Sequence, residues 1–382
     1  MDKIRELKTT SRWIDWAKTL TIFAILYCFL VSIGMIGSAF KGLGGGFAKE
    51  LIQSEAGPLI GLFIGILVTS LVQSSSTTTS LVVGMVAAGT FGQDPKIAVA
   101  AAIPYIMGAN IGTSITNTIV ALGHIVNKNE FRRAFAASII HDFFNVIAVI
   151  ILFPLQLKFG FISKSANWLA EMVVGSGTLT FKSPVKMVTK PTVSAIEDFF
   201  KLQNIMDYNW LLLIVAFGIL FFSLKYLTKL IRSLIMERLE AFFDTHIFKT
   251  AARAMFFGVF ITIMVQSSSI TTSLIIPLAG AGVLHLRQIF PYTLGANIGT
   301  TVTALLASLV SGTLAPLAVA FGHLVFNIYG ILIIWPVKKI RDIPLRLSQW
   351  FAELAIQNRI IPIIYILVVF FIIPLGLIFL VR

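Results

Sequence analysis

Residues 73–81 read QSSSTTTSL, and nearly the same stretch, QSSSITTSL, returns at residues 266–274. The first copy lies between two strongly apolar segments, LIGLFIGILVTSLV before it and LVVGMVAAG after it. A polar run in a soluble loop would have polar neighbours. A polar run between lipid-soluble flanks predicts a break in a membrane-embedded helix, because irregular backbone at membrane depth survives only inside protein or around a watery cavity.

The composition agrees with this setting. Hydrophobic residues make up 57% of the 382-residue chain, charged residues make up 12%, and the mean hydropathy is +0.90. These values are typical of an all-α polytopic membrane protein. Apolar stretches near the roughly 20 residues that cross a bilayer are residues 19–40, 131–153, 209–224, 314–336 and 360–381.

The net charge of +13 does not indicate a nucleic-acid partner. The basic residues stand in short loops beside apolar spans, where they set membrane orientation. The lead-in MDKIRELKTTSRWIDWAKT precedes a full-length span, so we expect a cytoplasmic N-terminus and no cleavable signal. Cys28 is the single cysteine, which excludes an intramolecular disulfide.

The repeated motif belongs to a longer internal repeat. PYIMGANIGTSIT at 104–116 returns as PYTLGANIGTTVT at 291–303, and HDFFNV at 141–146 returns as HLVFNI at 323–328. The three pairs keep their order, with offsets of 193, 187 and 182 residues. The sequence therefore predicts a duplicated membrane unit.

The distribution of Lys and Arg predicts that the two units are inverted. Residues 127–133 (NKNEFRR) hold three basic residues, whereas the corresponding loop at 311–316 (SGTLAP) holds none. Equivalent loops then face opposite sides of the membrane. We expect a cytoplasmic segment (1–18), repeat unit 1 (19–154), an external connector (155–206), repeat unit 2 (207–337), and a basic cytoplasmic segment with a final transmembrane helix (338–382).

Within each unit we expect a re-entrant hairpin turning at QSSS and a transmembrane helix interrupted at GANIGT. Broken helices in inverted repeats are typical of secondary transporters with a site near the bilayer midplane. Hydroxyl and amide groups and free N–H groups at a helix start can donate to an anion. Hydroxyl, amide and carbonyl oxygens can equally bind a hard cation such as Na⁺, so the motif chemistry allows both ligands.

The alternative for any one motif is structural. Ser and Thr often hold membrane helices together, at about 0.6–2 kcal/mol per hydrogen bond. Two copies, each accompanied by GANIGT and H-x-x-x-N, favour a functional site. We interpret His141 and His323 as packing or supporting groups, whereas a carboxylate at membrane depth, Asp142, is functional by default.

Paired QSSS motifs, GANIGTS and GANIGTT, FRRAFA and HDFFN together resemble the type II sodium-dependent phosphate cotransporters. The resemblance covers about residues 55–340 and implies a symporter that couples a sodium gradient to phosphate uptake. It implies a substrate site lined by the QSSS turns, to which we add two asparagine amides: Gln73, Ser74, Ser75, Ser76, Gln266, Ser267, Ser268, Ser269, Asn110 and Asn297. We expect sodium to be bound among Asp142, Asn145, Thr113, Thr300, Thr303, Asn327, Ser76 and Ser269.

The resemblance also has departures and consequences. The absence of a second cysteine and of any N-x-S/T sequon suits a bacterial version in the inner membrane. His124 and Asn127 replace two residues implicated in a sodium site in the family. Electrogenic members carry an aspartate at the position of Asp142, which implies a third cation here; the alternative is a carboxylate near the interface, paired with Arg132 or Arg133.

Other functions fit the sequence less well. A symporter of another small oxyanion or a dicarboxylate would use the same chemistry. A membrane enzyme would need a nucleophile with a base or a metal centre, and no such constellation is present. We therefore expect no enzyme activity, no cofactor besides co-transported Na⁺ and no transition metal. A regulatory scaffold would need a soluble domain, which residues 155–206 do not provide. The oligomeric state stays open.

Overall fold

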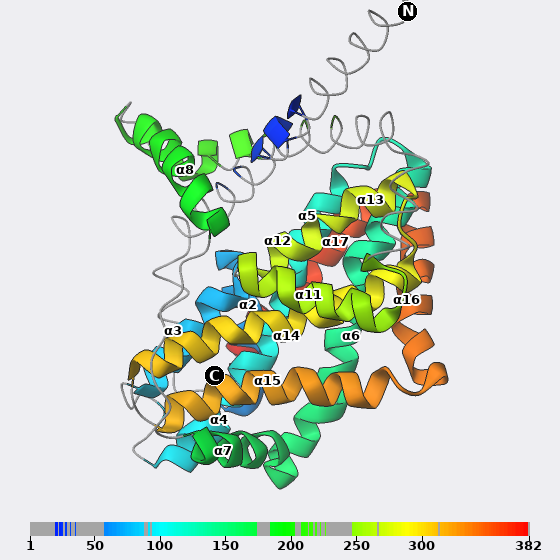
Figure 1. Cartoon of the computed structure of the whole chain (residues 1–382). Coiled ribbons are helices and arrows are strands. Elements are labelled where there is room, and N and C mark those ends of the chain that lie inside the picture. Colours follow the sequence, from blue (N-terminus) through cyan, green and yellow to red (C-terminus); the bar gives the residue numbers. More distant parts are fainter. Residues whose placement is uncertain are drawn as a thin grey trace, which may run out of the picture.

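The computed structural model describes residues 57–87, 94–173, 184–202, 247–265, 267–311 and 314–380, with isolated positions at 20–35, 91 and 208–226. Every regular element in these ranges is helical (Figure 1). The first unit contributes α2 (Pro58–Val72), α3 (Ser75–Ala87), α4 (Pro95–Gly112), α5 (Ser114–Leu122) and α6 (Lys128–Phe159). The second contributes α11 (Ala251–Val265), α12 (Ser268–Ser273), α13 (Ile275–Ala281), α14 (Leu286–Ser311) and α15 (Leu314–Ile334).

Four described helical stretches are long and apolar enough to cross a bilayer. They are Pro95–Leu122, Lys128–Phe159, Leu314–Ile334 and Ile361–Leu380. The chain is thus an all-α polytopic membrane protein. The expected spans at 19–40 and 209–224 are described only in part, and the described positions in both are helical.

The two hairpin helices α2 and α11 are shorter than a membrane crossing. Each has 15 residues, or about 22 Å at 1.5 Å per residue, against the roughly 30 Å of a hydrocarbon core. Both helices end at a QSSS motif, and both motifs continue into a second helix. Each QSSS stretch thus joins two helices, as the turn of a hairpin would.

Equivalent glycines pack each hairpin onto its own unit. A Cβ at Gly65 on α2 would lie 2.2 Å from the Tyr105 carbonyl oxygen, and a Cβ at Gly258 on α11 would lie 2.1 Å from that of Tyr292. In the reverse direction, a Cβ at Gly108 on α4 would lie 1.9 Å from the Leu62 carbonyl oxygen. A Cβ at its counterpart Gly295 on α14 would lie 2.0 Å from the Met255 carbonyl oxygen. The backbones approach this closely only because no side chain intervenes, and both units use the same contacts.

The prediction that GANIGT interrupts both helices is wrong for the second unit. Residues 295–300 lie inside the continuous helix α14. In the first unit α4 gives way to α5 at Thr113, whose φ of −59° and ψ of −31° are still helical. The glycines of the motif serve close packing instead: a Cβ at Gly112 would lie 2.7 Å from Thr69 Cβ, and one at Gly299 would lie 2.6 Å from Thr262 Cβ.

The connector between the units is more structured than its sequence indicated. Helix α6 runs five residues past the expected boundary at 154 and stops at Gly160, whose φ is +62°. It is followed by α7 (Phe161–Val173), which packs on α15, and by α8 (Pro184–Leu202). The connector therefore contributes a helix to the bundle.

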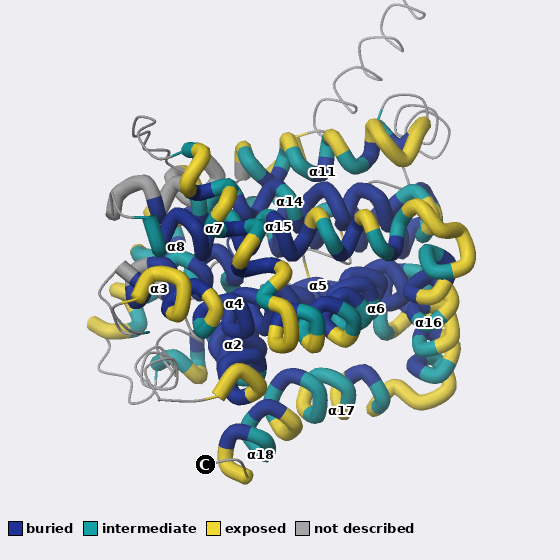
Figure 2. Tube along the Cα trace, turned by 90° about the horizontal axis from the view of Figure 1, so that it is seen from below, coloured by how far each residue is buried: buried dark blue, intermediate teal, exposed yellow. Residues whose placement is uncertain are grey.

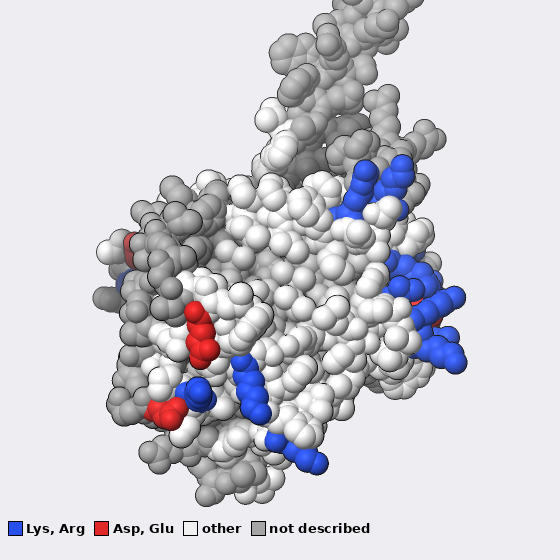
Figure 3. All heavy atoms as spheres, turned by 60° about the horizontal axis from the view of Figure 1, so that its bottom comes forward, with Lys and Arg blue, Asp and Glu red and all other residues white. Residues whose placement is uncertain are grey.

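The C-terminal region holds α16 (Lys338–Gln357), α17 (Ile361–Leu367), the π-helical turn η2 (Val368–Ile372) and α18 (Ile373–Leu380). Helix α16 packs on α6, while α17 and α18 run along one side of the molecule with many exposed residues (Figure 2). A broad uncharged surface separates Lys and Arg side chains at one edge from a mixed group of basic and acidic side chains near the other (Figure 3). This distribution suits a hydrocarbon belt between two headgroup layers.

Candidate ion and substrate site

The first QSSS turn is built around Gln73. Its φ of 56° is left-handed and ends α2, and it is the one non-glycine residue with a positive φ among the described positions. The side chain is buried: Nε2 donates to the Ser70 carbonyl at 2.7 Å, and Oε1 accepts from Thr116 Oγ1 at 2.6 Å. Ser75 and Ser76 then open α3 and are buried, whereas Ser74 is partly exposed. The turn thus gathers hydroxyls and a helix start inside the protein.

The second QSSS turn has the same form where it is described. Ser267 is the N-cap of α12, its Oγ accepting from Ile270 N at 3.3 Å, and Ser268 and Ser269 are buried. Leu274 is helical and joins α12 to α13. Gln266 lies outside the described residues.

Helix α5 lies between the two turns and contacts both. Thr116 donates to Gln73, as above, while the next residue, Asn117, accepts at Oδ1 from Thr272 Oγ1 at 2.9 Å and Ser273 Oγ at 3.0 Å. Sequence reasoning missed Asn117, because its counterpart in the second unit is Ala304 and it belongs to no repeated motif. Two consecutive side chains therefore link the hairpins of different repeats.

Four asparagines at the centre form a closed ring of hydrogen bonds, which we call the asparagine ring. Asn110 Nδ2 donates to Asn327 Oδ1 at 2.6 Å, and Asn327 Nδ2 donates to the Asn297 carbonyl at 3.3 Å. Asn297 Nδ2 donates to Asn145 Oδ1 at 2.9 Å, and Asn145 Nδ2 donates to the Asn110 carbonyl at 3.1 Å. All four side chains are buried, and each bond has an equivalent in the other repeat.

Two histidines complete the ring in matching positions. His323 Nε2 lies 2.8 Å from Asn110 Oδ1, and His141 Nε2 contacts Asn297 Oδ1 in the same way. Because each amide oxygen accepts, each Nε2 carries a proton. His141 Nδ1 then accepts from Ser114 Oγ at 2.9 Å, while His323 Nδ1 has no partner. The expectation of a supporting role for both histidines agrees with these contacts.

Two buried oxygens of the expected sodium ligands make no hydrogen bond. They are Thr300 Oγ1 on α14 and Asp142 Oδ1 on α6. The other expected threonines differ: Thr113 donates to the Ala109 carbonyl at 2.9 Å, and Thr303 is partly buried. A buried oxygen without a donor is costly and suits a cation.

Asp142 does not pair with either of the nearby arginines. Arg132 forms an exposed ion pair with Glu353 at 2.9 Å, and Arg133 donates to the carbonyls of Ala279 and Gly280. Asp142 itself is 1% exposed, and its Oδ2 accepts from Tyr365 Oη at 2.6 Å. The ion pair of Asp142 with Arg132 or Arg133, on which the interfacial alternative depended, is therefore not formed. Among the described membrane-spanning helices, Asp142 is the one buried carboxylate.

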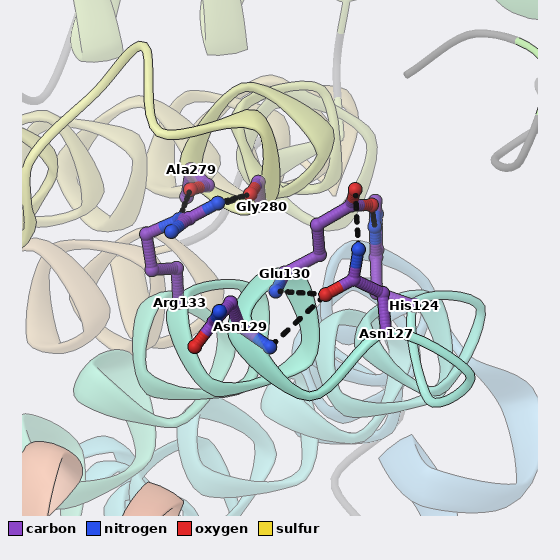
Figure 4. Close-up of polar contacts among 7 residues, drawn as sticks. All are labelled: His124, Asn127, Asn129, Glu130, Arg133, Ala279 and Gly280. Atoms are coloured by element: carbon purple, nitrogen blue, oxygen red, sulfur yellow. Dashed lines mark hydrogen bonds and ion pairs between the residues drawn. The ribbon is translucent and has the colours of Figure 1, made fainter. Parts of the chain in front are cut away.

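The departures lie before α6: His124 is in the turn that follows α5, and Asn127 is the N-cap of α6 (Figure 4). Asn127 Oδ1 caps the helix by accepting from the N–H groups of Asn129 and Glu130, and Glu130 approaches His124 Nδ1 at 3.5 Å. Arg133 reaches the end of α13 in the other repeat, with Nη2 2.6 Å from the Gly280 carbonyl. Here Asn127 has a local structural role, and Arg133 caps a helix end across the repeats.

Comparisons with known proteins agree with the repeat. The family model described as Na⁺/Pi-cotransporter matches residues 28–182 and 219–356, once in each half. The chain is 31% identical to human sodium-dependent phosphate transport protein 2B, 34% identical to the cattle 2B protein and 32% identical to mouse 2A protein. Each alignment covers 94% of this chain and 64–66% of the relative, so the chain spans about two thirds of their length. No solved structure matches the chain.

Proposed function

Because the chain belongs to the Na⁺/Pi-cotransporter family, we propose that it couples sodium entry to the uptake of inorganic phosphate. Its relatives are named as sodium-dependent phosphate transport proteins. Two QSSS turns, largely buried where described and joined through α5, carry this conclusion, since they bring anion-binding groups of both repeats to one helix. No catalytic group is invoked, because the reaction is transport and not covalent chemistry.

The phosphate is bound by donors of the two turns: Gln73, Ser74, Ser75 and Ser76 from the first, and Gln266, Ser267, Ser268 and Ser269 from the second. Hydroxyls and N–H groups at the start of α3 and α12 suit an oxyanion without needing a fixed positive charge. The amides of Asn110 and Asn297 are engaged in the asparagine ring and would bind substrate only after leaving it.

Sodium is bound by neutral oxygens together with one carboxylate. The free Oγ1 of Thr300 and the free Oδ1 of Asp142 support this assignment. Thr113, Thr303, Asn145, Asn327, Ser76 and Ser269 complete the proposed set. Phosphate near neutral pH is largely divalent, so a third Na⁺ at Asp142 makes each cycle move one net charge.

Transport proceeds by alternating access around this midplane site. The inverted charge pattern of the repeats and the equivalent glycine contacts support a rocking motion of two similar units. We place the protein in a bacterial inner membrane with its N-terminus in the cytoplasm. Inorganic phosphate, Na⁺ and the lipid bilayer are its partners.

Uptake of radiolabelled phosphate into proteoliposomes tests the function. An inward sodium gradient should drive accumulation, and replacement of Na⁺ by choline should abolish it. Excess sulfate and dicarboxylates should compete weakly. Uptake of those anions in preference to phosphate would reassign the substrate.

Paired glutamine variants test the site. Gln73→Ala and Gln266→Ala should each reduce uptake severely, because a lost donor to a buried anion costs about 1–3 kcal/mol. Gln156→Ala is the matched control. Gln156 is another buried glutamine, and its Oε1 accepts from Ile162 N and Ser163 N, away from both motifs. Normal kinetics in either motif variant would show that the repeat symmetry is only structural.

A further inference from the structure

The final membrane helix has no counterpart in either repeat. It begins as α17, passes through η2 and ends as α18, and most of its described side chains are exposed or partly exposed. Length and hydropathy suit a lipid-facing anchor. Its tyrosine, however, places a hydroxyl group inside the protein.

Asp142 is a second departure from the repeat symmetry. The sequence HDFFNV in α6 corresponds to HLVFNI in α15, so the counterpart of Asp142 is Leu324. The histidine and asparagine that flank it are present in both copies and join the asparagine ring in both. The first repeat therefore carries one additional charged group at an otherwise symmetric centre.

The final membrane helix and Asp142 are in direct contact. Tyr365 Oη on α17 donates to Asp142 Oδ2 at 2.6 Å, a distance typical of a charge-assisted hydrogen bond. The Tyr365 ring makes edge-type contacts with Phe351 of α16, at a centroid distance of 5.0 Å, and with Phe370 of η2, at 5.7 Å. Packing against two rings therefore holds the hydroxyl in place.

The geometry leaves one carboxylate oxygen available. Oδ2 is engaged by Tyr365, and Oδ1 is buried without a hydrogen-bond partner. A carboxylate has room for several donors or cations on its two oxygens. A donor that fixes Oδ2 also fixes the direction in which Oδ1 points.

We propose that Tyr365 is a positioning residue for sodium at Asp142, so that the final helix is a working part of the cation site and not only an anchor. This inference rests on the proposed role of Asp142 in sodium coupling. Tyr365 need not leave when Na⁺ binds, because the ion takes the other oxygen. Outer partners of this kind orient the ligands of many ion sites.

Tyr365→Phe tests the inference, because it removes the hydroxyl and keeps both aromatic contacts. The sodium concentration for half-maximal uptake should rise on the order of tenfold, as expected for a lost hydrogen bond to a charged group. The phosphate KM at saturating sodium should stay within about twofold. The voltage dependence of uptake should weaken. Tyr329→Phe is the matched control: Tyr329 Oη also bonds, to Ser165 Oγ at 2.7 Å, and its ring stacks on Phe161.

A sodium-dependent rise in Tm, measured in detergent without phosphate, gives a readout that does not need transport. Tyr365→Phe should melt like the wild type in choline and show a smaller rise in sodium. If Asp142→Gly abolishes voltage dependence while Tyr365→Phe keeps normal sodium and voltage dependence, the positioning role is wrong and the Asp142 site stands. If wild-type uptake is insensitive to voltage, the third cation is wrong, and the role of Tyr365 falls with it.

Discussion

Removal of one asparagine amide from the centre should destabilise the whole protein. Asn297→Ala leaves His141 Nε2–H without its acceptor and Asn145 Oδ1 without its donor. Asn110→Ala does the same to His323 and Asn327 in the other repeat. At about 0.6–2 kcal/mol for each hydrogen bond between membrane helices, either variant should lose about 1–4 kcal/mol of unfolding free energy. The two losses should be similar, because the contacts are equivalent.

The assay is unfolding by SDS in mixed micelles, followed by tryptophan fluorescence. Asn129→Ala, at an exposed position near the start of α6, serves as the control and should change stability by less than about 0.5 kcal/mol. Phosphate KM is measured on the same preparations. Unchanged stability together with a raised phosphate KM would refute the structural interpretation and assign the two amides to substrate.

Three further outcomes follow from single contacts. Gly258→Ala should prevent normal packing of α11 on α14 and cost about 1–3 kcal/mol or more, since its Cβ would lie 2.1 Å from the Tyr292 carbonyl oxygen; Gly376→Ala, with open space around it, should be neutral in the same SDS titration. Arg133→Gln should speed hydrogen exchange at residues 275–282, because a cationic donor at a helix C-terminus is worth about 0.3–2 kcal/mol; unchanged exchange would contradict the capping role. Thr300→Val should weaken sodium dependence without lowering stability, because its Oγ1 has no hydrogen bond to lose; a stability loss with normal sodium dependence would remove it from the cation site.

Much of the architecture could be predicted because each sequence motif occurs in both halves of the chain. The helix break after Val72 follows from a polar run in an apolar context, and the structure has α2 ending there with Gln73 left-handed. Residues shared by both copies, such as Asn110 and Asn297, could be identified as central from their recurrence alone. Their hydrogen-bond partners could not be predicted, because the ring is formed by side chains of four helices. The packing of these helices is not encoded in any local sequence pattern.

The errors have a common physical origin. The GANIGT motif predicts an interruption of α14, but the helix is continuous there. Gly295 and Gly299 instead permit close packing against α11, because they have no side chain. Asn117 and Tyr365 escaped notice because neither stands in a repeated motif. An internal repeat indicates which residues the two halves share, but it gives no signal for functional residues that are present in one half alone.

The closed asparagine ring has a consequence for the energy of conformational change. Each half contributes the same set of donors and acceptors, so the ring has two-fold pseudosymmetry. If the two halves exchanged conformations, the same hydrogen bonds would form. The ring therefore contributes nearly equally to the free energies of two conformations in which the halves exchange orientation. Small interactions that differ between the two conformations are then enough to favour one of them. In the proposed alternating-access cycle, contacts without a counterpart in the other half can favour one orientation over the other. Among the described residues, such contacts include Asp142 with Tyr365 and Asn117 with the second hairpin.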